Sequence, residues 1–594
     1  MDPKQLIGAG HRWLIRQEAL YLSLLAMLVG LLSGYAALLL RLGIEWVSIF
    51  WTGEIAWDRA LDTIPWYIFL LAPTTAGIIV GLINTHLMTG SELRGVAGVL
   101  ADLVERRGRI NRKQLVTETF GSAISVGSGA SLGREGPTVA LGAVIASEVG
   151  HRLSLSEHQV RTLIGCGVAA GIAASFNTPI AGVLFALEVI LADYAVATFS
   201  PIVISSVIAT VISRSELGNF PAFLIPEYHL VSTWEIGVYV GIGLACGLIA
   251  AALIGLMGRL RMLLVHFIPD RRLRPVLAGF CIGLLGLAIP YAMSIGYGTV
   301  GSILLEKINP ELFGIGFPLG VFLAIVLLGK LLATALSFAA GFPGGLLGPA
   351  LFLGAVVGAL FGSVVHDIAP SFTESYGAYA LVACGALTAA ALQAPITIIL
   401  MVFELSADYR IMLPLMAACI VATLVKRSFG HQSVFTEALE ERGIEMGGGL
   451  EKSWMRSVKV SRIQWRPIPS VPDNTHLAEL KQTYVASGKG CVQVVDDKQE
   501  MLGLITFTDL QPWLLDISMD HIAVAAEICN RKVLCISEDD SLLDAIAIFD
   551  REVFEQLPVT AADNPRRVLG VLSRQSVFST YHQLIVKHGE HGED

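Results

Sequence analysis

Charged residues are scarce in this chain of 594 residues, at 15%, whereas hydrophobic residues make up 54%. Soluble domains carry about 25% charged residues, so most of this chain is not a soluble domain. The net charge of −9 argues against a general nucleic-acid binder, and we expect no nucleic-acid partner. The composition instead indicates a multi-pass membrane protein with a soluble part attached.

Motifs for metal binding and catalysis are also missing. The eight cysteines are scattered without a Cys-x-x-Cys pair, so neither a zinc site nor a disulfide framework is indicated. No His-Glu-x-x-His or Gly-x-Ser-x-Gly motif occurs, and the apolar segments hold no cluster of metal ligands. We therefore predict no catalytic residue, no metal and no required cofactor. A membrane enzyme remains an alternative that no motif supports.

The first long apolar run, residues 19–40, is too long for a signal-peptide core and lacks an Ala-x-Ala cleavage site. We interpret it as a membrane helix, and the basic residues Lys4, Arg12 and Arg16 favour a cytoplasmic N-terminus over residues 1–18. Several later apolar segments are shorter than the ~20 residues of a full span and are broken by Gly or Pro. This pattern predicts discontinuous helices. These segments lie at about 64–85, 115–130, 137–149, 160–175, 179–194, 200–212, 235–258, 274–294, 316–337, 345–364, 376–391, 395–406 and 411–425.

The stretch Gly133-Arg-Glu-Gly-Pro137 places Arg134 and Glu135 between apolar segments, where charge is costly and usually functional. Pro137 suits the first turn of a helix, and the N–H groups and positive dipole end of that helix form a natural anion site. A carboxylate beside such a site can occupy it when ionised and leave it when protonated. We therefore predict that Glu135 is a gate, with Arg134 near the pathway. The alternatives are an Arg134–Glu135 pair or a helix cap; a nucleotide loop is disfavoured because no Gly-Lys-Ser/Thr follows.

The apolar part of the chain contains an internal repeat. The run Gly345-Leu-Leu-Gly-Pro349 echoes the stretch 133–137, and the spacing of Pro179 and Glu188 recurs in Pro395 and Glu404 at nearly the same offset. Two motifs in one order indicate a duplication, with halves at about 19–212 and 235–428. Hydropathy leaves open whether the copies run parallel or inverted.

The composition changes after residue 427, and from about residue 450 it is typical of a soluble domain. Two units there share the order helix, strand, polar turn, strand and helix start. The first unit predicts a helix at 477–487, strands at 491–495 and 502–505, and a helix opened by Thr506 and Asp509. The second predicts a helix at 541–550 and strands at 556–559 and 568–572, followed by Ser573. After a linker at 441–455, this pair resembles a tandem of CBS domains at about 456–516 and 517–594.

The membrane part, about residues 19–440, resembles the CLC family of chloride channels and chloride/proton exchangers. The stretch 133–137 carries this resemblance, and the runs 177–182 and 344–349 support it. The resemblance implies a polytopic all-α membrane domain with two inverted halves and discontinuous helices, joined here to an α/β CBS pair. It also implies a homodimer in the lipid bilayer, with one pore for small anions in each subunit.

By the same resemblance, Glu135 is the gating glutamate, and the backbone N–H groups of Leu346 and Leu347 contact the anion. The first anion-binding stretch of the family, Gly-Ser-Gly-Ile-Pro, matches Gly-Ser91-Glu92-Leu-Arg94 here. Ser91 keeps the hydroxyl that would bind the anion. The two new charges either form a local pair turned away from the pore or, in the case of Arg94, raise the positive potential of the pathway.

Two further departures bear on transport. Exchangers of the family often have a glutamate one residue after Glu188, where this chain has Val189. Valine cannot carry a proton, which favours a channel, although Glu188 or a chain of water molecules could act as the relay instead. The pore-lining tyrosine of the family best matches Phe435, which keeps the aromatic ring and lacks the hydroxyl.

In CBS pairs, an aspartate three residues after the Ser/Thr usually holds the ribose of an adenine nucleotide. Asp509 stands in that place after Thr506, whereas Ser576 follows Ser573. The resemblance therefore implies at most one good adenine-nucleotide site, at Thr506 and Asp509. The alternative is a purely dimerising and regulatory module.

The favoured function is a chloride channel with a voltage- or pH-dependent glutamate gate, regulated by cytoplasmic CBS domains and resident in the plasma (inner) membrane. A chloride/proton antiporter of the same fold is the main alternative. A CBS-bearing divalent-cation transporter is less favoured, because the apolar segments offer few acidic residues.

Overall fold

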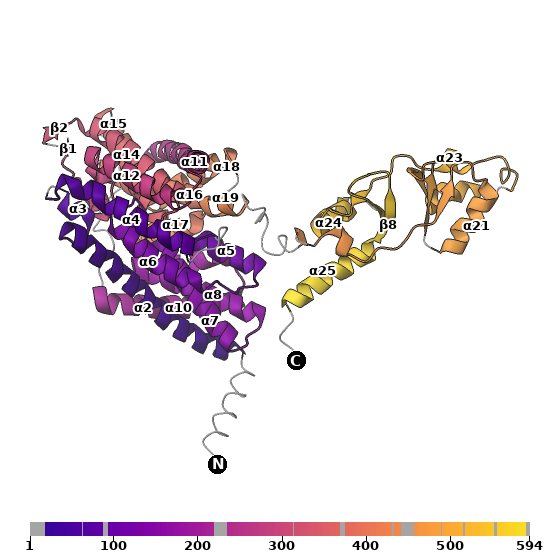
Figure 1. Cartoon of the computed structure of the whole chain (residues 1–594), viewed down its shortest axis with the longest axis horizontal. Helices are drawn as coiled ribbons and strands as arrows, with labels where there is room; N and C mark the ends of the chain where they lie inside the picture. The colour runs from indigo at the N-terminus through magenta and orange to yellow at the C-terminus, as the bar shows by residue number, and fades with distance from the viewer. Residues whose placement is uncertain are drawn as a thin grey trace, which may run out of the picture. The chain divides into compact units, whose positions relative to one another are not determined.

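The computed structural model describes residues 18–61, 63–86, 93–218, 235–312, 314–368, 375–430, 433–440, 455–456, 458–488, 490–514, 517–551 and 555–589. The chain divides into two compact units, Met1–Glu445 and Met446–Asp594, and each is described here by itself. Figure 1 shows the first unit as a packed bundle of helices and the second as a smaller α/β body.

The described part of the first unit is almost entirely helical. Its N-terminal half comprises α2 (Glu18–Thr52), α3 (Trp57–Ala60), α4 (Trp66–His86), α5 (Gly95–Glu105), α6 (Lys113–Gly127), α7 (Glu135–Arg152), α8 (Glu157–Phe176), α9 (Pro179–Phe185), the π-helix η1 (Ala186–Leu191) and α10 (Val196–Leu217). Its C-terminal half comprises α11 (Glu235–Phe267), α12 (Leu273–Ala288), the 3-10 turn η2 (Pro290–Ala292), α13 (Tyr297–Leu304), a short hairpin of β1 (Glu311–Leu312) and β2 (Ile315–Gly316), α14 (Leu319–Ala339), α15 (Leu347–Ile368), α16 (Tyr376–Leu392), α17 (Pro395–Ser406), α18 (Met412–Ser428) and α19 (Val434–Glu440).

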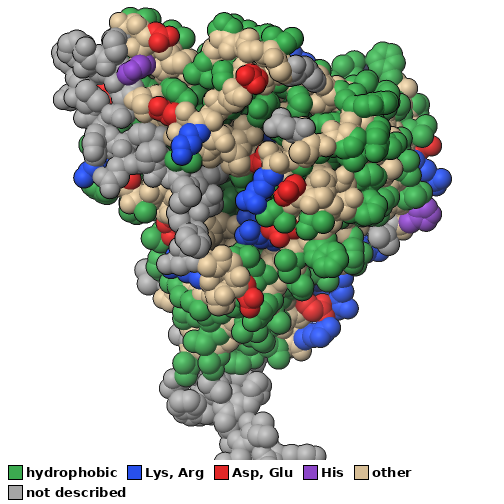
Figure 2. All heavy atoms as spheres, turned by 90° about the vertical axis from the view of Figure 1, so that its left-hand side faces the viewer, with side chains coloured by type: hydrophobic (Ala, Val, Ile, Leu, Met, Phe, Trp, Pro, Cys, Tyr) green, Lys and Arg blue, Asp and Glu red, His purple; other side chains and the backbone are tan. Residues whose placement is uncertain are grey.

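Seven of the described helices are long and apolar enough to cross a membrane. Others, such as α9 and α17, are too short for a full span. Apolar side chains cover much of the face drawn in Figure 2, as expected for a surface that contacts lipid. The predicted mixture of full-length and discontinuous helices is therefore present in the first unit.

The repeat detected in the sequence is visible in how the helices begin and end. In the N-terminal half, α8 ends at Asn177 in the left-handed conformation (φ 61°), and α9 starts at Pro179. In the C-terminal half, α16 ends at Gln393 with φ 55°, and α17 starts at Pro395. Proline suits the first position of a helix because its missing N–H would have no partner there.

Close helix packing depends on glycine in both halves. The α7–α8 contact brings Gly142 and Gly167 so near each other that a Cβ on Gly142 would lie 2.0 Å from the Gly167 carbonyl oxygen. In the other half, a Cβ on Gly358 of α15 would lie 2.3 Å from the Tyr379 carbonyl oxygen of α16. Small residues let backbones approach closely where lipid supplies no hydrophobic drive between helices.

The second unit contains two three-stranded sheets of the same design. The first has the order β3 (Ser470–Pro472), β4 (Cys491–Val495), β5 (Met501–Thr506), and the second has β6 (Ile536–Ser537), β7 (Gln556–Thr560), β8 (Val568–Ser573). In each sheet the first pair is parallel and the second antiparallel. The accompanying helices are α21 (Leu477–Ser487), α22 (Phe507–Leu510), α23 (Ala525–Ile528), α24 (Leu542–Arg551) and α25 (Arg574–Gly589), with 3-10 turns η3 (Val460–Arg462) and η4 (Gln511–Trp513). The predicted helices and strands of this unit all lie within about one residue of these bounds.

Candidate functional site

The two halves of the first unit meet at a backbone bridge between their matching Gly-x-x-Gly-Pro stretches. The Gly133 N–H donates to the Gly345 carbonyl at 2.7 Å, and the Gly345 N–H donates to the Gly133 carbonyl at 2.6 Å. The pairing is antiparallel, which is the geometry that an inverted arrangement of two copies produces. This bridge places the N-terminus of α7 beside the N-terminus of α15.

Glu135 is the first residue of α7, and its side chain is 3% exposed. The Tyr297 hydroxyl donates to its Oε1 at 2.9 Å, and the backbone N–H groups of Glu135 itself and of Gly348 lie near the carboxylate. Its Oε2 has no hydrogen-bond partner among the described residues. A Cβ on Gly345 would lie 2.6 Å from this oxygen, so only glycine leaves room for the carboxylate at the bridge.

Arg134 precedes α7 and is directed at α8. Its Nη2 donates to the Ser175 carbonyl at 2.7 Å, and its guanidinium lies 5.9 Å from the centroid of the Tyr297 ring. The same ring meets Phe176 edge to face. Arg134 thus anchors the start of α7 and flanks the tyrosine that contacts Glu135, without an ion pair to Glu135 within 4.0 Å in the described chain.

Glu135 borders a cavity of about 520 Å³ on which three helix N-termini converge. The lining includes the first residues of α5 and α7, the start of α15 at Leu346 and Leu347, and Phe435 of α19. N–H groups in the first turn of a helix have no intrahelical partner and carry the positive end of the dipole. The arginines that line the cavity are Arg94, Arg261, Arg271 and Arg274, and its acidic side chains are Glu135 and Glu437. Helix N-termini and arginine side chains are the groups that attract anions in proteins.

Of the predicted anion-binding residues, Leu346, Leu347 and Phe435 line this cavity together with Glu135. Ser91 and its neighbour Glu92 lie outside the described residues, so the predictions for these two stay untested. The expectation that the family's pore tyrosine corresponds to Phe435 is compatible with the position of Phe435 on the cavity wall.

Arg94 lines the cavity and donates to two neutral groups. Its Nη1 donates to the Gly341 carbonyl at 2.9 Å, and its Nη2 donates to Asn84 Oδ1. The buried carboxyl group of Glu118 accepts from the Gly95 N–H at 3.2 Å, and it interacts electrostatically with Arg94. The carboxyl group of Glu118 therefore lies near Arg94, at the start of α5.

Glu188 and Glu404 cap each other's helices across the repeat. Glu188 accepts from the N–H groups of Ile396 (3.2 Å) and Thr397 (2.7 Å) at the start of α17. Glu404 accepts from those of Ile180 (2.9 Å) and Ala181 (2.8 Å) at the start of α9.

These caps give the repeated Pro-to-Glu spacing a structural purpose, because a carboxylate at a helix N-terminus satisfies free N–H groups. Neither Glu188 nor the half-buried Val189 is among the residues that line the cavity around Glu135.

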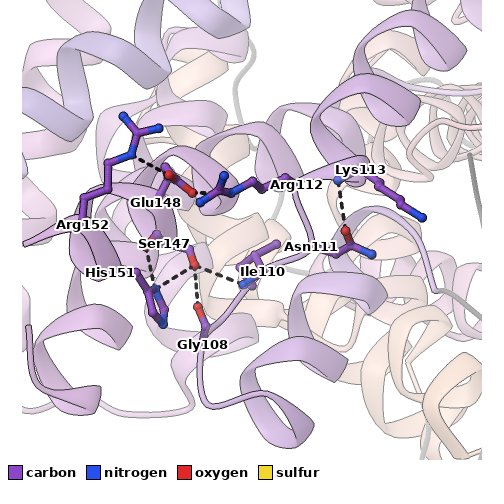
Figure 3. A network of polar contacts seen from close by, with 9 residues as sticks. All are labelled: Gly108, Ile110, Asn111, Arg112, Lys113, Ser147, Glu148, His151 and Arg152. Carbon is purple, nitrogen blue, oxygen red and sulfur yellow. Dashed lines mark hydrogen bonds and ion pairs between the residues drawn. The ribbon is translucent and has the colours of Figure 1, made fainter. Parts of the chain in front are cut away.

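The other end of α7 is fixed by a polar network (Figure 3). Ser147 Oγ donates to the Gly108 carbonyl at 2.6 Å and accepts from the Ile110 N–H at 3.1 Å. Glu148 pairs with Arg112 at 2.7 Å and with Arg152 at 2.6 Å. Both ends of the helix that begins with Glu135 are thus anchored.

In the second unit, Asp509 caps α22. Its Oδ2 accepts from the Thr506 N–H at 2.8 Å and from the Thr506 hydroxyl at 2.6 Å. In the second copy, Ser573 and Ser576 share a hydrogen bond of 2.8 Å instead. A cavity of about 240 Å³ lies beside Ser573, and its lining does not include Thr506 or Asp509.

The sequence reasoning missed Tyr297, Glu118 and Lys330, and it also missed the charged residues Arg261, Arg271, Arg274 and Glu437 of the cavity wall. Tyr297 contacts Glu135 directly, and Glu118 and Lys330 are fully buried ionisable residues in the membrane unit. Glu118 and Lys330 could have been found by asking which charges fall inside apolar helical segments. Tyr297 carries no such signal, because a single tyrosine in an apolar stretch is ordinary.

The fold and the cavity define a class of protein: a multi-pass membrane transporter of anions, built from two inverted copies around helix N-termini. Residues 76–427 match the family model for voltage gated chloride channels, and residues 460–516 and 524–582 match that for CBS domains. The chain belongs to the CLC family of chloride-transport proteins and carries a C-terminal CBS pair.

Individual relatives differ in their described activities. The chain is 28% identical to chloride channel protein CLC-f of Arabidopsis thaliana over 640 residues, covering 94% of this chain and 80% of that protein. It is 27% identical over 365 residues to the H(+)/Cl(-) exchange transporter ClcA of Vibrio cholerae, and the match covers 61% of this chain and 73% of that protein. Its fold resembles the crystal structure of a slow cyanobacterial Cl-/H+ antiporter, with a TM-score of 0.62 and 22% sequence identity. The match covers 71% of this chain and 97% of that one.

Proposed function

We propose that this protein is a chloride channel in which the cavity between α5, α7 and α15 is the anion site and Glu135 is the gate. The observation that carries this proposal is the buried carboxylate of Glu135, which lies where three helix N-termini converge. Free N–H groups there replace part of the water that chloride loses. Dipolar sites without a full positive charge hold an ion weakly enough for it to leave.

Gating follows from competition for the same donors. In the closed state the ionised Glu135 occupies the anion position, where it accepts from the Tyr297 hydroxyl and lies near the backbone N–H groups at the helix start. Protonation removes the charge that these donors stabilise, so the side chain leaves and chloride takes its place. Chloride flux therefore rises as the pH falls, and a high chloride concentration has the same effect.

The preference for a channel rests on the inner acidic positions. Val189 cannot carry a proton, and both oxygens of Glu188 are engaged at the start of α17. One observation favours the antiporter alternative: Glu437 lines the same cavity as Glu135, so a second carboxylate borders the anion route. The exchanger and antiporter among its relatives leave that alternative equally open.

Flux from liposomes with imposed gradients decides between these two functions. A channel reverses at the chloride equilibrium potential whatever the proton gradient, whereas an antiporter reverses at a potential that shifts with pH. A proton-dependent shift that disappears in Glu437→Gln would establish the antiporter with Glu437 as the relay. Replacing chloride by magnesium in the same assay tests the divalent-cation transporter, for which no flux is expected.

The remaining proposals concern assembly and regulation. We infer a homodimer in the plasma (inner) membrane, with the N-terminus and the CBS pair in the cytoplasm. The CBS pair is proposed to regulate the gate and to bind an adenine nucleotide at Thr506 and Asp509. Support for this site comes from Asp509, because the second copy has Ser576 at the matching position.

Voltage dependence is a separate proposal. It follows if the charge of Glu135 moves within the membrane field.

A further inference from the structure

The Tyr297 hydroxyl that contacts Glu135 is carried by a sharply bent segment, residues 292–298. Ser294 has φ 52° and Gly296 has φ 83°, and both values fall in the left-handed region. Non-glycine residues adopt this conformation only where the surroundings hold them in it. The Ser294 N–H donates to the Gly129 carbonyl at 2.8 Å, which ties the bend to the end of α6.

Lys330 holds the first part of this segment. Its side chain is fully buried on α14, and its Nζ donates to the carbonyl oxygens of Ser294 at 2.5 Å and of Ala292 and Met293 at 3.4 Å. The same Nζ lies 4.5 Å from the ring centroid of Phe352 on α15. Lys330 forms no ion pair within 4.0 Å in the described part of the chain. A lysine buried at this depth is costly and usually serves a function.

Asp58 holds the other end. Its Oδ2 accepts from the N–H of Gly298, the residue that follows Tyr297 in the first turn of α13. Asp58 belongs to α3, which is fixed because the Trp57 indole N–H donates to the Gly127 carbonyl at 2.8 Å. Asp58 is also the charged group that acts on Lys330. The tyrosine thus lies between two anchored points.

We propose that Lys330 is a positioning residue for the gate: with Asp58, it holds the 292–298 segment so that Tyr297 stabilises Glu135 in its closed position. This inference rests on the proposed gating role of Glu135. The other charged groups near Glu135 are Arg134, which flanks Tyr297, and behind it Arg41 and Glu45 of α2. Of these, Arg134 reaches the 292–298 segment at the Tyr297 ring, whose centroid lies 5.9 Å from its guanidinium. Arg41 and Glu45 pair with each other and have no hydrogen bond or ion pair to this segment among the described residues.

The test is the pH dependence of chloride flux from liposomes. In Lys330→Met the bent segment loses its donors, the tyrosine no longer stabilises the ionised glutamate, and less acid is needed to open the gate. The pH of half-maximal flux is expected to rise by about one unit, the effect of losing one hydrogen bond to a charged group. Tyr297→Phe should shift the pH of half-maximal flux by a similar amount, and the double variant Lys330→Met/Tyr297→Phe should shift it no further. Lys330→Arg should leave this pH close to the wild-type value.

A matched control lies four residues further along α14. Thr334→Val removes a buried hydrogen bond to Ser131 of 2.8 Å and is expected to lower the melting temperature without moving the pH midpoint. If Lys330→Met does not yield folded protein, Asp58→Asn tests the other anchor and should shift the midpoint in the same direction by a smaller amount.

Two different results separate this inference from the proposed function. If Glu135→Gln abolishes the pH dependence but neither Lys330→Met nor Asp58→Asn moves the midpoint, Lys330 does not position the gate. A shift in Lys330→Met that adds in full to that of Tyr297→Phe overturns the inference as well. If Glu135→Gln keeps the wild-type pH dependence, Glu135 is not the gate and the proposed function fails first.

Discussion

The two halves of the membrane unit start matching helices in the same way and use them differently. Both α7 and α15 begin within a Gly-x-x-Gly-Pro stretch, and their preceding glycines bond to each other. The first position of α7 is Glu135, whereas the first position of α15 is Leu347. One copy therefore supplies a titratable group and the other supplies only backbone N–H groups. Both copies share the helix N-terminus, and a single side chain, Glu135, distinguishes the copy that we propose as the gate.

The largest effect is expected from removing that one difference. Glu135→Gln keeps the size of the side chain without the charge, so the flux should stay high at neutral pH and lose its pH dependence. Leu347→Ala is the matched change at the first position of α15 and should keep the pH dependence. Flux measured across a pH series checks both, and a pH profile of Glu135→Gln like that of the wild type would show that the two copies do not differ in this way.

The start of α5 is the next place to test. In Arg94→Gln the buried Glu118 loses the charge that stabilises it, so the free energy of unfolding should fall by about 1–3 kcal/mol. Chloride should also bind less tightly, because Arg94 lines the cavity. Thermal melting and chloride titration on this one variant measure the two effects.

The double variant Arg94→Gln/Glu118→Gln is the control for this prediction. It should recover most of the lost stability while its chloride affinity stays low, because the isolated buried charge is gone and the cavity still lacks its guanidinium. A single variant with reduced stability and unchanged chloride affinity would assign Arg94 a purely structural role.

The reciprocal caps extend the comparison of the halves to the proton question. Glu188→Gln and Glu404→Gln each weaken one helix cap, and each should cost about 0.5–2 kcal/mol of stability. If Glu188 is only a cap, the two variants should behave alike and leave the reversal potential unchanged. A change in the reversal potential with Glu188→Gln alone would instead identify Glu188 as a proton relay.

The smallest effect is expected in the CBS pair, where two copies again differ at one position. Asp509→Ala should abolish adenine-nucleotide binding to the full-length protein, as measured by calorimetry, and should cost about 1 kcal/mol through the lost α22 cap. Ser576→Ala is the matched change in the second copy and should leave binding intact. Two equal sites, or undiminished binding in Asp509→Ala, would contradict this prediction.

Much of this architecture was readable from the chain because its signals are local. Pro179 and Pro395 mark helix starts, and the alternation of helix and strand in residues 477–572 predicts two of the three strands in each CBS sheet. The repeat was detectable because copied motifs keep their order. The position of Glu135 at a helix N-terminus also followed from its neighbours.

The partners of Glu135 could not be predicted in this way. Tyr297 lies 162 residues from Glu135 in the sequence, and Arg94 reaches Gly341 across 247 residues. The family resemblance suggested Glu188 as an alternative proton relay, whereas its carboxylate lies at the start of α17. Sequence spacing alone does not distinguish a carboxylate that caps a helix from one that carries protons.

The sequence by itself determined where the helices start, that the chain is duplicated, and that a carboxylate stands at one of those starts. These features depend on backbone restrictions and missing N–H groups, which act over a few residues. Only the tertiary structure decided which side chains meet that carboxylate and which buried charges support them. Such contacts depend on how distant apolar helices pack, and apolar surfaces specify burial without specifying a polar partner.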